Sequence, residues 1–302
     1  MFYFLSLLMG ILISVMILVN GGLTEEYGVY SATVIIHIVG LLLVSVLVII
    51  KKEQFFPKFH PWFFYLGGAF GVLITVANNF AFGRISVSAI LALGLLGQSI
   101  ASIVIDQFGL LGMQRHPFKK HRLIGIILVV IGIRIMTVQA GFEFAAILLS
   151  FKAGVCIVAS RTLNAGLASV TSVRVGTFYN YLVGLVVSIP VLLMLGGGEA
   201  PFQEFTVSPR WYIYIGGVLG VWVVLMSNVV VKRVAAFYLT LLVFVGQIST
   251  GIVIDSLMAQ EISFILVMGG SLVAAGLCAN LFIDKIKLKY DNPQIKSQNL
   301  DK

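Results

Sequence analysis

Two glutamines occupy matched positions in two similar stretches of the chain. Gln98 precedes Asp106, and Gln247 precedes Asp255 at the same spacing. That spacing corresponds to roughly 12 Å along a helix, which places each glutamine near the middle of a membrane span if its aspartate lies at the end. Amide groups there can donate to and accept from a polar ligand, and a hydrogen bond between helices is the alternative. We expect both glutamines to line a central cavity and to contact the substrate.

Further polar residues interrupt the apolar runs. His37 lies well inside an apolar stretch. It is a candidate proton carrier because the ordinary pKa of histidine is about 6.5, and a neutral histidine bonded to a neighbouring helix is the alternative. Asn180 and Tyr181 occupy the matching region of the second stretch. Asn79 and Asn228 lie toward opposite faces. We include all five among the candidate substrate-binding residues, with gate or interhelix contacts as the alternative for the last two.

Arg161 has no basic counterpart, since the matched position in the first stretch is Ile17. Asn164 follows Arg161 at i+3, so both lie on one helix face. A guanidinium there can bind an anionic group through two parallel hydrogen bonds. The alternatives are snorkelling to the membrane surface and pairing with a carboxylate. We treat Arg161 as a candidate contact to an anionic or strongly polar part of the substrate.

Four polar residues are expected at helix ends or gates. Asn20 and Asn164 precede or lie near small residues and are expected to cap their helices. Asp106 and Asp255 are expected at the ends of their spans, on opposite faces of the membrane. As anions at helix C-termini they oppose the helix dipole, so a nearby arginine or lysine is expected to compensate them.

The elements that position these residues must be membrane helices. Of 302 residues, 59% are hydrophobic and only 11% are charged, whereas soluble domains carry about 25% charged residues. The fold class that we predict is therefore all-α and membrane-embedded. Ten apolar segments of spanning length are expected, near 2–20, 28–50, 62–82, 86–106, 121–138, 145–166, 174–195, 211–231, 236–256 and 264–284.

Other chemistries find no support in the residues. The chain has no phosphate-binding glycine motif, zinc-ligand spacing or nucleophile motif, so we expect no enzymatic activity, no cofactor and no metal. The net charge of +8 does not indicate nucleic acid binding, because lysines and arginines concentrate in alternate loops. This distribution predicts that both termini are cytoplasmic.

The two stretches extend into two copies of five spans each. The basic loop around Arg115–Arg122 corresponds to a loop containing Glu261, and Arg84 corresponds to Lys232-Arg233. Because five is an odd number, the second copy begins on the other side of the membrane, and its loop charges are reversed accordingly. The sequence therefore predicts an inverted repeat. Its units are an N-terminal repeat over 1–140 and a C-terminal repeat over 141–302, which includes a short cytoplasmic tail.

The pattern resembles the drug/metabolite transporter superfamily, and within it the YdcZ-type branch. The likeness rests on Asn20-Gly21-Gly22-Leu23, on Gly67-Gly68-Ala69-Phe70-Gly71, and on Gly97-Gln98 followed by Asp106-Gln107-Phe108-Gly109. The second copy keeps Gly246-Gln247 and Asp255 but lacks the Phe-Gly extension. The resemblance implies a fused two-repeat protein of a bacterial inner membrane. It also implies a cavity lined by the first four spans of each half, with spans five and ten at the edge.

Function is expected to follow this architecture. We interpret the chain as a secondary transporter, an exporter of a small metabolite or drug-like solute by alternating access. The expected partners are that solute, the lipid bilayer and a coupling ion, either a proton or another. Spans one and six contain no central carboxylate of the kind that couples export to protons in small multidrug transporters. A non-transporting membrane subunit and a lipid flippase of the same architecture are the alternatives, and both a monomer and a homodimer are compatible with the pattern.

Overall fold

The structure is a computed structural model that describes residues 2–55, 60–108, 122–138, 143–197, 206–230, 233, 236–259 and 263–291. Within these residues the fold is helical throughout and contains no β-strand. The first repeat comprises α1 (Phe2–Tyr27), α2 (Val29–Ile50), the short 3-10 helix η1 (Trp62–Leu66), α3 (Gly67–Ala81), α4 (Val87–Phe108) and α5 (Arg122–Thr137). The second comprises α6 (Phe144–Val170), α7 (Val173–Leu195), η5 (Trp211–Ile215), α8 (Gly216–Val230), α9 (Ala236–Ala259) and α10 (Phe264–Asp291).

Each predicted span coincides with a helix, but the helices differ in their ability to cross a bilayer. Eight segments of the described chain are long and apolar enough to span, counting η1 with α3 and η5 with α8. In α5 and α10 the apolar portions are shorter, at Gly125–Thr137 and Phe264–Gly276. The predicted membrane-embedded, all-helical class is therefore confirmed, and the count of ten spans stays a prediction.

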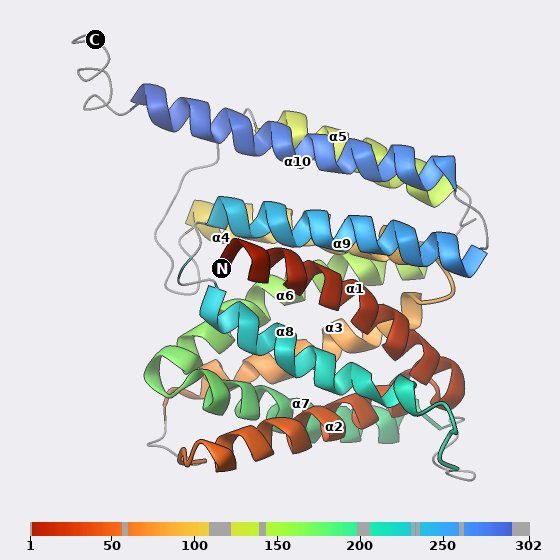
Figure 1. Cartoon of the computed structure of the whole chain (residues 1–302), viewed down its shortest axis with the longest axis vertical. Helices are drawn as coiled ribbons and strands as arrows, with labels where there is room; N and C mark the ends of the chain where they lie inside the picture. Colours follow the sequence, from red (N-terminus) through yellow and green to blue (C-terminus); the bar gives the residue numbers. More distant parts are fainter. Residues whose placement is uncertain are drawn as a thin grey trace.

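Eight of the helices form two sides that pack against each other. One side consists of α1, α2, α8 and α9, and the other of α6, α7, α3 and α4, with contacts within each set. Figure 1 shows α1 and α8 in front and α3 and α6 behind them. The pair α5 and α10 packs chiefly on itself, next to α4 and α9, and forms the top layer of Figure 1. The resemblance implied this edge position for spans five and ten.

Glycines bring the helices close within each side, and the same crossing occurs twice. A Cβ at Gly10 would overlap the backbone of α9 at Val243, and a Cβ at Gly154 would overlap the backbone of α4 at Gly94. Small residues permit such close approach of membrane helices. In the first contact a helix of the first repeat packs on one of the second, and in the other contact the equivalent helices have exchanged repeats. The two sides are therefore related by an approximate two-fold rotation.

Matched helices run in opposite directions where they meet. His37 on α2 packs on Gly184 of α7, whereas Gly40, further along α2, packs on Tyr181, which is earlier in α7. In the same way Gly132 on α5 contacts Gly269 of α10, and Gly125 contacts Gly276. Helices related by an axis parallel to their length would run in the same direction. Both pairs of matched helices therefore pack antiparallel.

Neither Asn20 nor Asn164 caps a helix, contrary to our expectation. α1 continues from Asn20 to Tyr27, and α6 continues from Asn164 to Val170. The glycines after Asn20 do not end α1, because Leu23 and Tyr27 are buried in a cluster with residues of α2 and η5. Burial of these later side chains outweighs the modest helix-breaking tendency of glycine. Both asparagines consequently lie within their helices and not at the ends.

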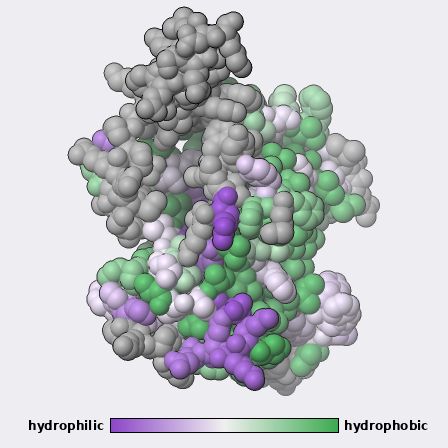
Figure 2. Space-filling model, turned by 60° about the vertical axis from the view of Figure 1, so that its left-hand side comes forward, coloured by the Kyte–Doolittle hydropathy of each residue, from purple (hydrophilic) through white to green (hydrophobic). Residues whose placement is uncertain are grey.

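The outer surface is apolar, as a bilayer requires. On α2 the exposed residues Ile38, Leu42, Val46 and Ile49 follow one another at helical spacing. Figure 2 shows hydrophobic side chains over much of the surface and a hydrophilic group in the lower part of the view, on the side of the molecule that carries the end of α2. This arrangement places lipid around the bundle and water at its ends.

Candidate functional site

A cavity of about 180 Å³ lies between the two sides. Its described lining comes from the first four helices of each repeat, as the resemblance implied. It is formed by Met9, Ile13, Met16, Asn20, Ile36, His37, Gly71, Ile74, Thr75, Asn78, Gln98, Ile157, Ser160, Arg161, Asn164, Asn180, Tyr181, Gly220, Val223, Val224, Ser227, Asn228 and Gln247. Nine of the twelve residues singled out from the sequence are in this set.

The matched glutamines both reach the cavity, but they do not form a symmetric pair of contacts. Gln247 is buried in the lining on α9. Gln98 on α4 accepts a hydrogen bond from Arg161, with 3.5 Å between Nη2 and Oε1. The amide of Gln98 is thus held by the charged side chain opposite it on α6.

Arg161 is the one charged residue among the described residues that line the cavity. Its guanidinium carries five N–H donors, and the bond to Gln98 is long and uses one of them. The ion pairs described in the structure join other residues, namely Arg84 with Glu143, Arg174 with Glu53 and Arg210 with Glu26. Of the two alternatives for Arg161, the described geometry favours neither snorkelling nor carboxylate pairing, because the side chain lines the cavity.

His37 and Tyr181 occupy matched positions on α2 and α7, and each ring lies over the partner helix's glycine. The Gly184 and Gly40 positions leave no room for a Cβ against these rings. The ring centroids are 5.8 Å apart. His37 Nδ1 lies 2.7 Å from the carbonyl oxygen of Thr33, so Nδ1 carries the proton that is donated. Nε2 is then left as the acceptor of a neutral ring.

Asn164 belongs to a satisfied polar network, whereas its counterpart Asn20 does not. Asn164 Nδ2 donates to Asn180 Oδ1 at 2.9 Å and to Ser160 Oγ at 3.2 Å. The residues matched to Asn180 and Ser160 in the first repeat are Ile36 and Met16. Asn20 Nδ2 therefore lacks both of these acceptors, and Asn20 Oδ1 is buried without a hydrogen bond among the described residues.

Asn79 and Asn228 also differ although they occupy matched positions. Asn228 lines the cavity, and its Nδ2 is buried without a described partner. Asn79 is absent from the described lining and donates to Thr33 Oγ1 at 3.4 Å. The interhelix alternative thus fits Asn79, while the neighbouring Asn78 takes its place in the lining.

Asp255 fixes a helix end, but the helix is not its own. One carboxylate oxygen accepts from the Val87 N–H at 2.7 Å, and the other accepts from the Ser88 N–H at 2.9 Å and from the Ser88 hydroxyl. These groups form the N-terminus of α4, where the helix dipole favours an anion. The expectation that an arginine or lysine compensates the charge of Asp255 is wrong, because the N-terminus of α4 compensates it. Asp106 lies in α4, and its side chain is outside the described residues.

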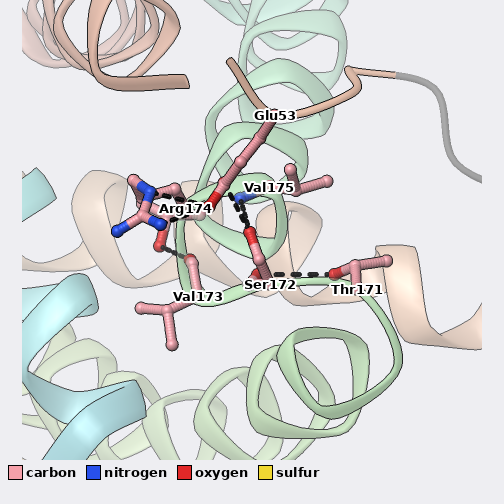
Figure 3. Close-up of polar contacts among 7 residues, drawn as sticks. Glu53, Thr171, Ser172, Val173, Arg174 and Val175 are labelled. Carbon is pink, nitrogen blue, oxygen red and sulfur yellow. Dashed lines mark hydrogen bonds and ion pairs between the residues drawn. The ribbon is translucent and has the colours of Figure 1, made fainter. Parts of the chain in front are cut away.

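A second contact between the sides lies at the opposite face, next to the end of α2 (Figure 3). Glu53 accepts hydrogen bonds from Arg174, with Nε at 3.0 Å, and from Ser172 Oγ at 2.7 Å. Ser172 also accepts from the Val175 N–H and so caps α7. Burial on its own raises the pKa of Glu53, but these hydrogen bonds, with the charges of Arg174 and Lys51, hold the pKa below its ordinary value.

Several lining residues were not selected from the sequence as sites. Ser160 lies one turn before Asn164, and Thr75 lies one turn before Asn79, so helical spacing from a selected polar residue points to both. Met16 and Val224 carry no such signal, since an apolar residue in a span ordinarily faces lipid or the core. Within the described part of the chain no group of histidine, cysteine and acidic residues has the arrangement of a metal site.

Comparison with known proteins agrees with this architecture. The sequence model of the family described as "Putative inner membrane exporter, YdcZ" matches the chain twice, over residues 1–135 and 145–279. No curated protein is similar enough in sequence to match. A solved structure titled "Crystal structure of protein" is similar with a TM-score of 0.58 and 13% identity, over 93% of this chain and 96% of that one. That likeness shows the fold, and the family matches show two repeats. The chain is a multi-pass membrane protein that belongs to the YdcZ family of inner membrane exporters, within the drug/metabolite transporter type.

Proposed function

We propose that the protein is a secondary transporter that exports a small metabolite or drug-like solute by alternating access. The observation that carries the proposal is the cavity, which is lined by matched residues of both repeats and lies between two sides related by an approximate two-fold rotation. The family to which the chain belongs supports export as the direction.

We further propose that the two repeats, near 1–140 and 141–302, have inverted orientations in the membrane. The antiparallel pairing of α2 with α7 and of α5 with α10 supports this, because an axis perpendicular to the helices lies in the membrane plane. The concentration of lysines and arginines in alternate loops of the sequence supports a cytoplasmic location for both termini. In that orientation Glu53 and Arg174 are cytoplasmic, and Asp255 is near the outer face.

Alternating access requires that the two sides separate at one face while they stay joined at the other. Glu53 on the α2 side contacts Arg174 and Ser172 on the α7 side at one face. Asp255 on α9 contacts the start of α4 at the other. Since each contact crosses between the sides, each can close one end of the pathway, and the cavity residues then meet the solute from alternate faces.

The sequence has no nucleotide-binding motif, so we propose that an ion gradient supplies the energy for transport. His37 in the lining has a free acceptor at Nε2 when it is neutral, so it can take up a proton within the cavity. Replacement of His37 by Asn removes this protonation and is expected to abolish the dependence of transport on a proton gradient. Transport that keeps its full dependence in that variant would assign coupling to another ion.

Export is tested in proteoliposomes loaded with a cytosolic metabolite extract. We expect the protein to release specific solutes, detected by mass spectrometry, and the Gln98→Leu/Gln247→Leu double variant to release them at least about tenfold more slowly, since it removes two polar contacts from the cavity. Ser256→Leu is the matched control. Ser256 also lies on α9, but its hydroxyl bonds the carbonyl of Ile252 on the same helix. Equal release from the double variant and the wild type would overturn the role of the glutamines, and no specific release by the wild type would overturn export.

A further inference from the structure

The two walls of the cavity differ in chemistry at positions that the repeat makes equivalent. On the α6/α7/α3 side are Ser160, Asn180 and Thr75, and their counterparts on the α1/α2/α8 side are Met16, Ile36 and Val224. Arg161 corresponds in the same way to Ile17. Every one of these exchanges places the polar residue on the same side. The cavity therefore has a polar wall and an apolar wall.

The polar wall gathers around Arg161. It consists of Thr75, Asn78, Gln98, Ser160, Arg161, Asn164 and Asn180, and the same side also contributes Gly71, Ile74, Ile157 and Tyr181 to the lining. The amide nitrogen of Asn164 donates hydrogen bonds to Asn180 and Ser160. Arg161 has only its long hydrogen bond to Gln98 among the described residues. A guanidinium in a membrane span is costly unless water or an anion accompanies it. A carboxylate can accept two of its remaining N–H groups at once.

The apolar wall is built by α1 and α8. Met9, Ile13 and Met16 follow one another on one face of α1, and Val223 and Val224 lie on α8, which packs against α1. This side also contributes Asn20, His37, Ser227, Asn228 and Gln247 to the lining. Met9, Ile13 and Val223 nevertheless belong to one apolar cluster, and methionine adapts readily to irregular apolar partners. It can hold an apolar group that water solvates poorly.

We infer that the solute is a small amphipathic anion, a monocarboxylate with a compact apolar body. Its carboxylate lies at Arg161 and Gln98, and its apolar body lies against Met9, Ile13, Met16, Val223 and Val224. This inference rests on the proposed function, because it names the class of solute that the same cavity takes. The cavity volume of about 180 Å³ is below the 300–1,000 Å³ common for ligand pockets, so the body is small.

The same geometry argues against cations and zwitterions. No aspartate or glutamate is among the described residues of the lining. An ammonium group would therefore enter beside Arg161 without an opposite charge, which is unfavourable in a site shielded from water. A neutral amphipath would keep the apolar contacts and lose the charged one.

Four probes of similar chemistry separate these contributions in the purified full-length protein in lipid nanodiscs. Phenylacetate has both groups, 2-phenylethanol lacks the charge, phenethylammonium reverses it, and acetate lacks the apolar body. We expect calorimetric titration to give phenylacetate the highest affinity, with 2-phenylethanol and acetate weaker by about tenfold or more and phenethylammonium weakest. Equal or tighter binding of the neutral or cationic probe would overturn the inference, and so would the absence of phenylacetate binding.

Two variants locate the head and the body of the anion. Arg161→Gln is expected to weaken phenylacetate about tenfold and to leave 2-phenylethanol unchanged, because only the charged contact is lost. Met16→Ser, which installs the residue of the matched position, is expected to weaken both probes several-fold. The unchanged binding of 2-phenylethanol to Arg161→Gln shows that this variant is folded. Equal weakening of both probes by Arg161→Gln would contradict a carboxylate contact.

The failure of this inference differs from the failure of the proposed function. If proteoliposomes release other solutes while phenylacetate does not bind, the protein is a transporter and the amphipathic anion is wrong. If phenylacetate binds with the expected dependence on Arg161 but no solute crosses the membrane, the cavity chemistry stands and transport is wrong.

Discussion

The two faces of the protein join its two sides by contacts of different kinds. At the face where α9 ends, the buried carboxylate of Asp255 accepts from two backbone N–H groups and one hydroxyl of α4. At the face where α2 ends, Glu53 forms an ion pair with Arg174. The side chain of Glu53 is 20% exposed and that of Arg174 is 36% exposed. A buried helix cap resists separation, whereas a partly exposed ion pair contributes only about 0–1 kcal/mol. On the proposed mechanism, we therefore expect the face at Glu53 to open more readily.

The largest effect is expected at Asp255. Asp255→Leu leaves the N–H groups of Val87 and Ser88 buried without an acceptor, which costs about 1–3 kcal/mol. The expected result is a clearly lower midpoint of thermal unfolding in detergent, with a smaller loss for Asp255→Asn, which retains one acceptor oxygen. A leucine variant as stable as the wild type would remove the distinction between the two faces.

A smaller effect on stability, but a direct effect on opening, is expected at the other face. Arg174→Ala breaks the pair with Glu53 and should cost no more than about 1 kcal/mol, which corresponds to an increase of up to about fivefold in the population open at that face. The measurement is the rate at which a cysteine at Thr75, in the cavity, is alkylated from that face.

The Glu26–Arg210 pair provides a matched control. Both residues belong to the α1/α8 side, so their pair does not cross between the two sides. Arg210→Ala should therefore leave the alkylation rate unchanged. If both arginine variants accelerate alkylation equally, the crossing contact has no special role.

The smallest effect is a dependence of this opening on pH. The pKa of Glu53 is lowered in the folded state. Its stabilising contribution is therefore complete above the ordinary pKa of glutamate, about 4.3, and is lost as the pH falls through the lowered value. Opening at the Glu53 face should rise over that acidic range, measured against a cysteine at the exposed Ser169 on the same face as reference, and Glu53→Gln should abolish the change. A wild-type rate that is constant over this range would contradict the lowered pKa.

The sequence was informative where the repeat itself carried the signal. Matched spacing led to Gln98 and Gln247, and the unmatched Arg161 pointed to an asymmetric cavity, because all three break apolar runs. Long-range packing could not be predicted in this way. α1 continues past Asn20 because Leu23 and Tyr27 are buried against other helices, and Asp255 finds its donors on α4.

The apolar wall could not be predicted from the sequence for a related reason. Met16 and Val224 are ordinary residues of a membrane span, and only the position of their helices turns them toward the cavity. The comparison of equivalent positions across the repeat becomes informative once the structure shows that both members of a pair, such as Met16 and Ser160, line one cavity.

The central claim, that the cavity is reached from alternate faces of the membrane, is tested most directly with one cysteine. Thr75→Cys, with Cys156 and Cys278 replaced by alanine, places a thiol in the lining at a position of nearly the same size. A membrane-impermeant maleimide is applied to right-side-out and to inside-out vesicles, with Gly197→Cys as the reference that is labelled from one face alone. Alternating access predicts that Thr75→Cys is labelled from both faces. Labelling from a single face, or from neither, would contradict it.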